Sequence, residues 1–63
     1  MKRLALERKK RNMSQTDLAF KLRIHPSQIS KIESGVARPY KPSRKKLEEF
    51  FNKSIDDLLE EVN

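Results

Sequence analysis

The chain has 63 residues, a formal net charge of +6, no cysteine and a single histidine. At this length we expect one domain over residues 1–63 that buries about 60% of its unfolded surface, which leaves little room for an enclosed substrate cavity. The missing cysteines exclude disulfides and argue against a zinc site, and no apolar run has the length of a signal peptide or a membrane span. We therefore expect a cytoplasmic protein with no cofactor and no membrane partner.

The charge is distributed unevenly along the chain. Residues 1–46 hold fourteen of the fifteen lysines and arginines but only three acids, whereas residues 47–63 hold one lysine and six acids. This asymmetry indicates a polyanionic partner, such as nucleic acid, that approaches the amino-terminal three quarters of the chain. The alternative is a solvated basic surface that has no ligand.

Two helices are predicted in the first third of the chain. The first covers about residues 2–11, and Asn12 suits its end because asparagine tolerates the left-handed conformation. Ser14 and Asp17 have the spacing of a capping box, so a second helix should begin directly after Ser14. Its inward stripe is formed by Leu18, Ala19 and Leu22.

A third helix is bounded by two residues with special backbone geometry. Pro26 suits the first helical position because its φ is fixed and it lacks an N–H group. Gly35, the only glycine, marks the end because it adopts positive φ without strain. Residues 36–41 are then predicted to form a loop.

Two further helices complete an all-α prediction, because no segment alternates apolar and polar residues as a strand does. The fourth is predicted over about residues 42–51. Ser54 and Asp57 form a second capping box that opens the fifth. The amphipathic pattern of this last helix continues through Ile55, Leu58, Leu59 and Val62.

The aromatic residues are few, and they bear on the kind of partner. We expect Phe20 to point toward the carboxyl-terminal helices, and three of the four aromatic side chains to be buried. Tyr40, in the predicted loop, suits an interface and a core cover equally well.

The predicted third helix has two distinct sides. At 100° per residue, Ile29 and Ile32 mark the buried side. The opposite side carries small polar and basic residues, namely Ser27, Lys31 and Ser34, flanked by Gln28 and Ser30. Such a helix can enter a major groove about 12 Å wide and present donors and acceptors to base edges.

Glu33 lies near the apolar side of the same helix. An ionised carboxylate is costly there unless it is paired. Arg8 of the first helix is the expected partner, because an arginine fork matches a carboxylate. The alternative is that Glu33 lies in water at the helix edge.

Several groups of residues at fixed spacings together resemble the Cro and repressor type of helix-turn-helix domain, also called the xenobiotic-response-element family. The similarity covers nearly the whole chain. The matching residues are Leu4, Leu6 and Arg8; Met13, Ser14, Gln15, Leu18 and Ala19; 29–33 with Gly35; Arg38 with Pro39; and 54–59.

The resemblance implies a compact five-helix, lambda-repressor-like DNA-binding domain in which helices 2 and 3 form the helix-turn-helix. It implies that the bases are contacted from the positions of Pro26, Ser27, Gln28 and Lys31. It implies that backbone phosphates are contacted from the positions of Gln15, Ser34, Arg38 and Lys41. Arg8 and Glu33 then form the family's internal ion pair, which agrees with the angular argument.

Two departures from the family pattern fall in the turn before the third helix. Arg23 stands where glycine is common, and a left-handed arginine costs on the order of 1 kcal/mol. His25 stands where serine or threonine caps the helix, so we expect a weaker cap. As a pH sensor or metal ligand His25 lacks partners, so we expect a structural or backbone-contact role.

A third departure concerns the base readers. Pro26 and Ser27 replace residues that are long and polar in many relatives. Pro26 offers only apolar contact and Ser27 discriminates poorly between bases. Base reading should therefore shift to Gln28 and Lys31.

These patterns predict a sequence-specific regulator of double-stranded DNA, a repressor or controller acting as a homodimer on a pseudo-palindromic operator. The dimer contact is expected in the loop 36–41 and the fourth or fifth helix. The resemblance places such a protein in the cytoplasm, prokaryotic or phage-encoded and associated with the nucleoid. We expect no small-molecule ligand and no enzymatic activity, because no motif resembles a nucleophile with its base, and Ser14, Ser30 and Ser54 suit caps or groove contacts.

Two alternatives remain. One is a protein-interaction module such as an antitoxin that also binds its own promoter, although such proteins normally carry a toxin-binding tail and this chain ends soon after the fifth helix. The other is an RNA-binding basic bundle, which lacks exposed aromatics for stacking if three of the four are buried.

Overall fold

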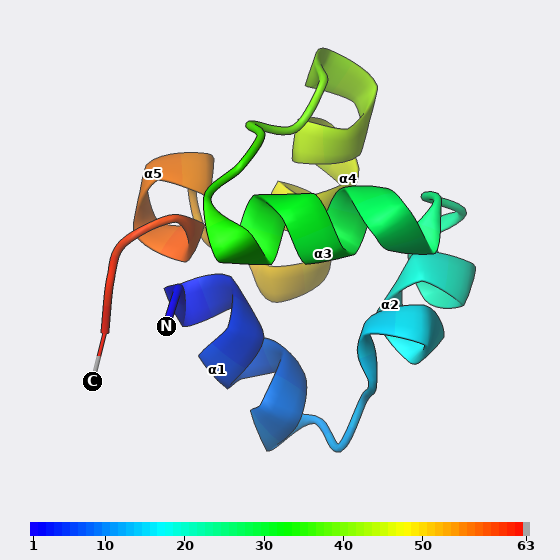
Figure 1. Cartoon of the computed structure of the whole chain (residues 1–63), viewed down its shortest axis with the longest axis horizontal. Coiled ribbons are helices and arrows are strands. Elements are labelled where there is room, and N and C mark those ends of the chain that lie inside the picture. The colour runs from blue at the N-terminus through cyan, green and yellow to red at the C-terminus, as the bar shows by residue number, and fades with distance from the viewer. Residues whose placement is uncertain (63) are drawn as a thin grey trace.

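The computed structural model describes residues 1–62, which form five helices: α1 (Arg3–Lys10), α2 (Gln15–Leu22), α3 (Pro26–Ser34), α4 (Lys41–Phe51) and α5 (Ile55–Leu58). In Figure 1, α3 lies across the front of the molecule, with α1 below it, α2 and α5 at its two ends and α4 behind. Within the described residues there is no strand, so the five-helix, all-α prediction is confirmed. None of these helices is long and apolar enough to cross a membrane.

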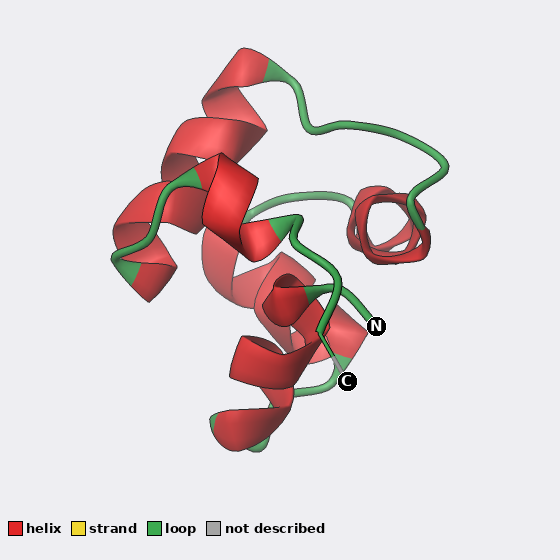
Figure 2. Ribbon diagram, turned by 90° about the vertical axis from the view of Figure 1, so that its left-hand side faces the viewer, coloured by secondary structure: helices red, strands yellow, loops and turns green. Residues whose placement is uncertain are grey.

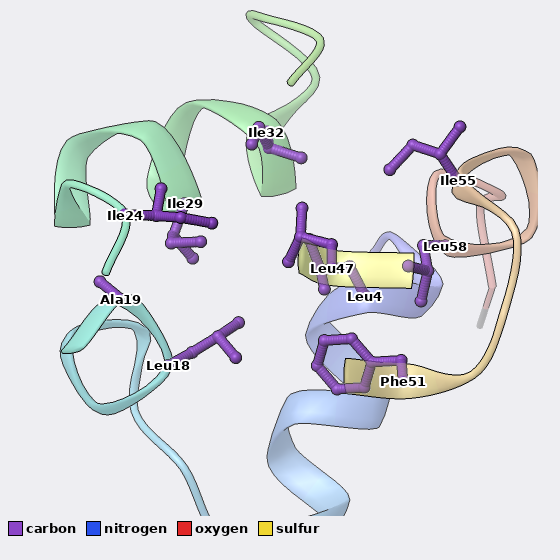
Figure 3. Close-up of a cluster of buried hydrophobic side chains, with 10 residues drawn as sticks. All are labelled: Leu4, Leu18, Ala19, Ile24, Ile29, Ile32, Leu47, Phe51, Ile55 and Leu58. Carbon is purple, nitrogen blue, oxygen red and sulfur yellow. The ribbon is translucent and has the colours of Figure 1, made fainter. Parts of the chain in front are cut away.

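Every helix contributes to one apolar core, drawn in Figure 3. The fully buried side chains are Leu4, Leu18, Ile29, Ile32, Leu47 and Leu58. Figure 3 places Leu47 of α4 beside Leu4 of α1, with Phe51 and Leu58 around them. The core therefore joins all five helices, and α2 and α3 contribute Leu18 and Ile29 to it.

The helix ends follow from local chemistry. The Ser14 hydroxyl accepts a hydrogen bond from the Asp17 N–H at 2.9 Å, and the Asp17 carboxylate accepts one from the Ser14 N–H at 3.0 Å. Asn12 and Arg23 both adopt left-handed backbone geometry with φ of 56°. The turn before α3 thus holds the strained arginine that the sequence predicts.

The fifth helix is shorter than predicted, because it ends at Leu58 instead of continuing through Val62. The backbone of the following segment pairs with the other end of the chain. The Glu60 carbonyl accepts from the Arg3 N–H at 2.8 Å, and the Val62 N–H donates to the Met1 carbonyl at 2.8 Å. These bonds replace the helical ones and hold the two ends of the chain together.

Two predictions about aromatic residues are wrong: Phe20 does not pack toward the carboxyl-terminal helices, and fewer than three of the four aromatic side chains are buried. Phe20 is 79% exposed and Tyr40 is 72% exposed, while Phe51 is buried and Phe50 is half-buried. Phe20 follows Leu18 by two positions, which rotates it by about 200° to the outer side of α2. The chain therefore does expose two aromatic side chains that could stack on bases.

The capping box predicts a specific acid response. A hydrogen bond from the backbone N–H of Ser14, together with a smaller contribution from the Ser14 side chain, lowers the pKa of Asp17 from its usual 3.8. A lowered pKa in the folded state contributes stability that is present above the unfolded pKa and is lost as the pH falls through the folded pKa. We expect Asp17→Asn to lower the melting temperature at pH 5–7, and the difference from wild type to shrink below about pH 4.

Thermal unfolding followed by circular dichroism between pH 2 and pH 7 measures this difference. Asp56→Asn is the matched control, because Asp56 is an exposed carboxylate in the first turn of another helix. A deficit in Asp17→Asn that is the same at every pH would contradict the assignment.

Candidate nucleic-acid interface

The helix α3 is terminated at both ends by local hydrogen bonds. At its start, Nδ1 of His25 accepts from the Ser27 N–H at 3.1 Å, so His25 does cap the helix. At its end, Gly35 has φ of 82° and its N–H reaches the Ile32 carbonyl. A Cβ at Gly35 would have room, with Lys2 Cε at 3.6 Å, so the left-handed conformation is what requires glycine.

One side of α3 is buried and the other is open to solvent. Ile29 and Ile32 are 0% and 2% exposed. The exposed residues of the helix include Ser27, Ser30, Lys31 and Ser34, and Gln28 is half-buried. Figure 2 views α3 along its axis and shows it at the outer side of the molecule, where no other helix covers it.

A groove of about 470 Å³ runs between α3 and the loop that follows it. Its polar lining includes His25, Ser27, Gln28 and Lys31 from the α3 side and Arg38 and Tyr40 from the loop. Three of the four predicted base-contacting residues therefore line one hollow, next to a predicted phosphate contact. Pro26, the fourth, lies exposed at the first position of the same helix.

The structure brings Arg8 and Glu33 together as a two-point pair. Nε of Arg8 lies 2.7 Å from Glu33 Oε2, and its second guanidinium nitrogen lies 3.1 Å from Oε1. The side chains are 9% and 7% exposed. Arg8 also donates to the Met13 carbonyl at 2.7 Å, so one guanidinium joins α1, α3 and the segment before α2.

Gln15 belongs to the same network. Its Nε2 donates to Glu33 Oε1 at 3.0 Å, which fixes the amide at the first position of α2 next to α3. Sequence reasoning assigned Gln15 to a phosphate but did not foresee this bond. The amide retains one N–H for a ligand, and its orientation is set by a carboxylate that Arg8 holds in place.

The other predicted phosphate contacts are exposed at the carboxyl-terminal side of α3. The Ser34 hydroxyl donates back to the Lys31 carbonyl at 3.1 Å, so its proton is engaged within the helix. Arg38 lies 3.7 Å from Asp56, but the two side chains are 74% and 89% exposed, and such a pair contributes little. Lys41 is the first residue of α4, one residue earlier than the predicted helix start.

Two contributors to this surface were missed by sequence reasoning. Ser43 lines the groove from the first turn of α4, and Tyr40 lines it from the loop. Tyr40 was considered only as a dimer contact or core cover. No local pattern reveals these neighbours, because the loop brings α4 back beside α3 only through the tertiary fold.

Two short helices joined by a tight turn, with the second one presenting its polar side outward, define the helix-turn-helix class of DNA-binding domains. The chain matches the family model described as helix-turn-helix over residues 4–58. It belongs to this family, whose Cro/C1-type members are DNA-binding regulators. Neither the search of curated proteins nor the search of solved structures returned a match.

Proposed function

We propose that this protein is a sequence-specific transcriptional regulator, a repressor or controller, that binds double-stranded DNA as a homodimer. We place it in the cytoplasm, encoded by a prokaryote or a phage and associated with the nucleoid. The base-contacting residues of the proposal are Pro26, Ser27, Gln28 and Lys31. The phosphate-contacting residues are Gln15, Ser34, Arg38 and Lys41.

The exposed polar side of α3 carries the proposal. A helix about 10–12 Å in diameter fits a major groove about 12 Å wide. Lys31 and Gln28 face the hollow beside α3. Within residues 1–62 Lys31 forms no ion pair, so its ammonium is available to the acceptor edge of guanine.

Exposed apolar side chains in the loop after α3 support the dimer. Val36 is 75% exposed and Tyr40 is 72% exposed. Apolar and aromatic side chains of this kind anchor protein interfaces when a partner covers them. A two-fold dimer would place two copies of α3 about one DNA turn apart and would read a pseudo-palindromic site.

Selection from a random duplex pool at about 0.15 M salt tests this proposal. We expect enriched sites with two related half-sites about one helical turn apart. Lys31→Ala and Gln28→Ala should each cost about 1–3 kcal/mol at particular base pairs. Arg38→Ala should weaken all sequences alike and reduce the salt slope by about one.

Lys46→Ala is the matched control for Lys31→Ala. It removes the same charge from a different hollow, which lies beside Leu22 and Phe50, and it should leave every base preference intact. Equal losses on all duplexes from Lys31→Ala, Gln28→Ala and Arg38→Ala would refute the assignment of readers. Single, unpaired half-sites would refute the dimer, and no enrichment would refute sequence-specific DNA binding and favour the protein-interaction alternative.

A further inference from the structure

His25 and Ser27 make two hydrogen-bonding contacts at the start of α3. The backbone N–H of Ser27 donates to His25 Nδ1 at 3.1 Å. The Ser27 hydroxyl oxygen lies 2.8 Å from the same nitrogen. Both side chains are exposed, and both line the groove beside α3.

The first contact determines the direction of the second. A backbone N–H can only donate, so His25 Nδ1 must carry a lone pair instead of a proton. A neutral imidazole then has its proton on Nε2. Because Nδ1 is an acceptor, the Ser27 hydroxyl must be the donor in the second contact, and its proton shares the single Nδ1 lone pair with the Ser27 N–H.

This arrangement changes what Ser27 can offer to DNA. A free serine hydroxyl rotates and can either donate or accept, which is why serine discriminates poorly between bases. With its proton held by His25, Ser27 Oγ presents only lone pairs to a ligand. In the major groove the matching donors are the exocyclic amino groups of adenine and cytosine.

We propose that His25 is a positioning residue for specificity: it fixes the Ser27 hydroxyl as an acceptor, so that Ser27 selects adenine or cytosine at the base it faces. This inference rests on the proposed DNA-binding function and sharpens it. His25 contacts Ser27, the residue that faces the base, and acts on specificity through it. The cap and the base preference are two consequences of one ring nitrogen.

The tautomer can be measured without DNA. His25 is the only histidine of the chain, so a long-range ¹H–¹⁵N spectrum of the full-length protein gives its ring signals without ambiguity. In a mildly alkaline buffer we expect the ring proton on Nε2 and none on Nδ1. A proton on Nδ1 would overturn the inference.

Duplex selection with three variants tests the effect on specificity. Ser27→Ala should abolish a preference of about fivefold for adenine or cytosine at one base, which identifies the base that Ser27 faces. His25→Ala frees the hydroxyl, so guanine and thymine should become as acceptable there. His25→Asn keeps an acceptor oxygen near Nδ1 and should retain the preference, because asparagine is also a good helix cap.

The ratio of the affinities for duplexes that differ at the base opposite Ser27 separates this role from a purely structural one. Loss of the cap in His25→Ala lowers the folded fraction, but it lowers the apparent affinity for every duplex by the same factor. An unchanged preference in His25→Ala, or a wild-type preference for guanine or thymine opposite Ser27, would overturn the inference while the DNA-binding proposal stands. If the wild type enriches no site, both proposals fail together.

Discussion

Arg8→Met should destabilise the domain by about 3–5 kcal/mol, because it leaves the Glu33 carboxylate without its cation. The Glu33 side chain is 7% exposed, and both of its oxygens are held by Arg8 nitrogens. The single hydrogen bond from the Gln15 amide cannot replace a positive charge. A chain of 63 residues has about 3–9 kcal/mol of stability in total, so we expect the variant to lose about a third or more of it and to unfold at a much lower urea concentration.

A double-mutant cycle separates the interaction between Arg8 and Glu33 from the packing of their aliphatic carbons. Replacing both partners with apolar residues, as in Arg8→Met with Glu33→Leu, removes the unpaired charge and should recover most of the loss. Urea unfolding followed by circular dichroism gives the four free energies of unfolding. Additive losses in the double variant would show that the two side chains do not depend on each other.

The same cycle bears on DNA binding. Gln15 is held by Glu33 Oε1, so the stable double variant should also lose the fixed orientation of the Gln15 amide. Loss of a phosphate contact alone lowers the affinity of the protein for all duplexes by a similar factor and leaves its base preferences intact. The ion pair thus connects the internal packing of α1 and α3 to the residue proposed to bind phosphate.

Features that depend on local chemistry were accessible from the sequence. Pro26 and Gly35 bounded α3 because the fixed φ of proline and the freedom of glycine to adopt positive φ each act on their own position. The capping box of α2 required only residues three positions apart. The pairing of Arg8 and Glu33 was inferred from the angular position of Glu33 on α3, since a carboxylate near an apolar side must find a cation.

Features that depend on contacts between distant segments were not accessible. The pattern of α5 continues to Val62, yet the helix ends at Leu58 because the backbone there bonds to Met1 and Arg3. Nothing within residues 55–62 reveals this competitor. The exposure of Phe20 has a different cause, because its position about 200° from Leu18 on α2 already indicates the outer side, and the expectation of a contact with the carboxyl-terminal helices was wrong.

Leu47→Ala should cost about 2–5 kcal/mol, which is the other change expected to approach the total stability of the domain. Leu47 is 0% exposed, and Figure 3 shows it between the side chains of α3 and those of α1 and α5. Truncation removes apolar contacts and leaves a cavity that the surrounding helices fill only in part. Since α4 forms one wall of the groove through Ser43, partial collapse should also loosen the loop before it.

Leu47→Met is the control, because it nearly conserves volume and should cost less than about 1.5 kcal/mol. The midpoint of urea unfolding measures both variants, and an unchanged m-value is needed before the two losses are compared. If Leu47→Ala unfolded at the urea concentration of Leu47→Met, α4 would not depend on this side chain for its attachment. The core would then rest on α1, α2 and α3, and the position of the loop beside α3 would need another cause.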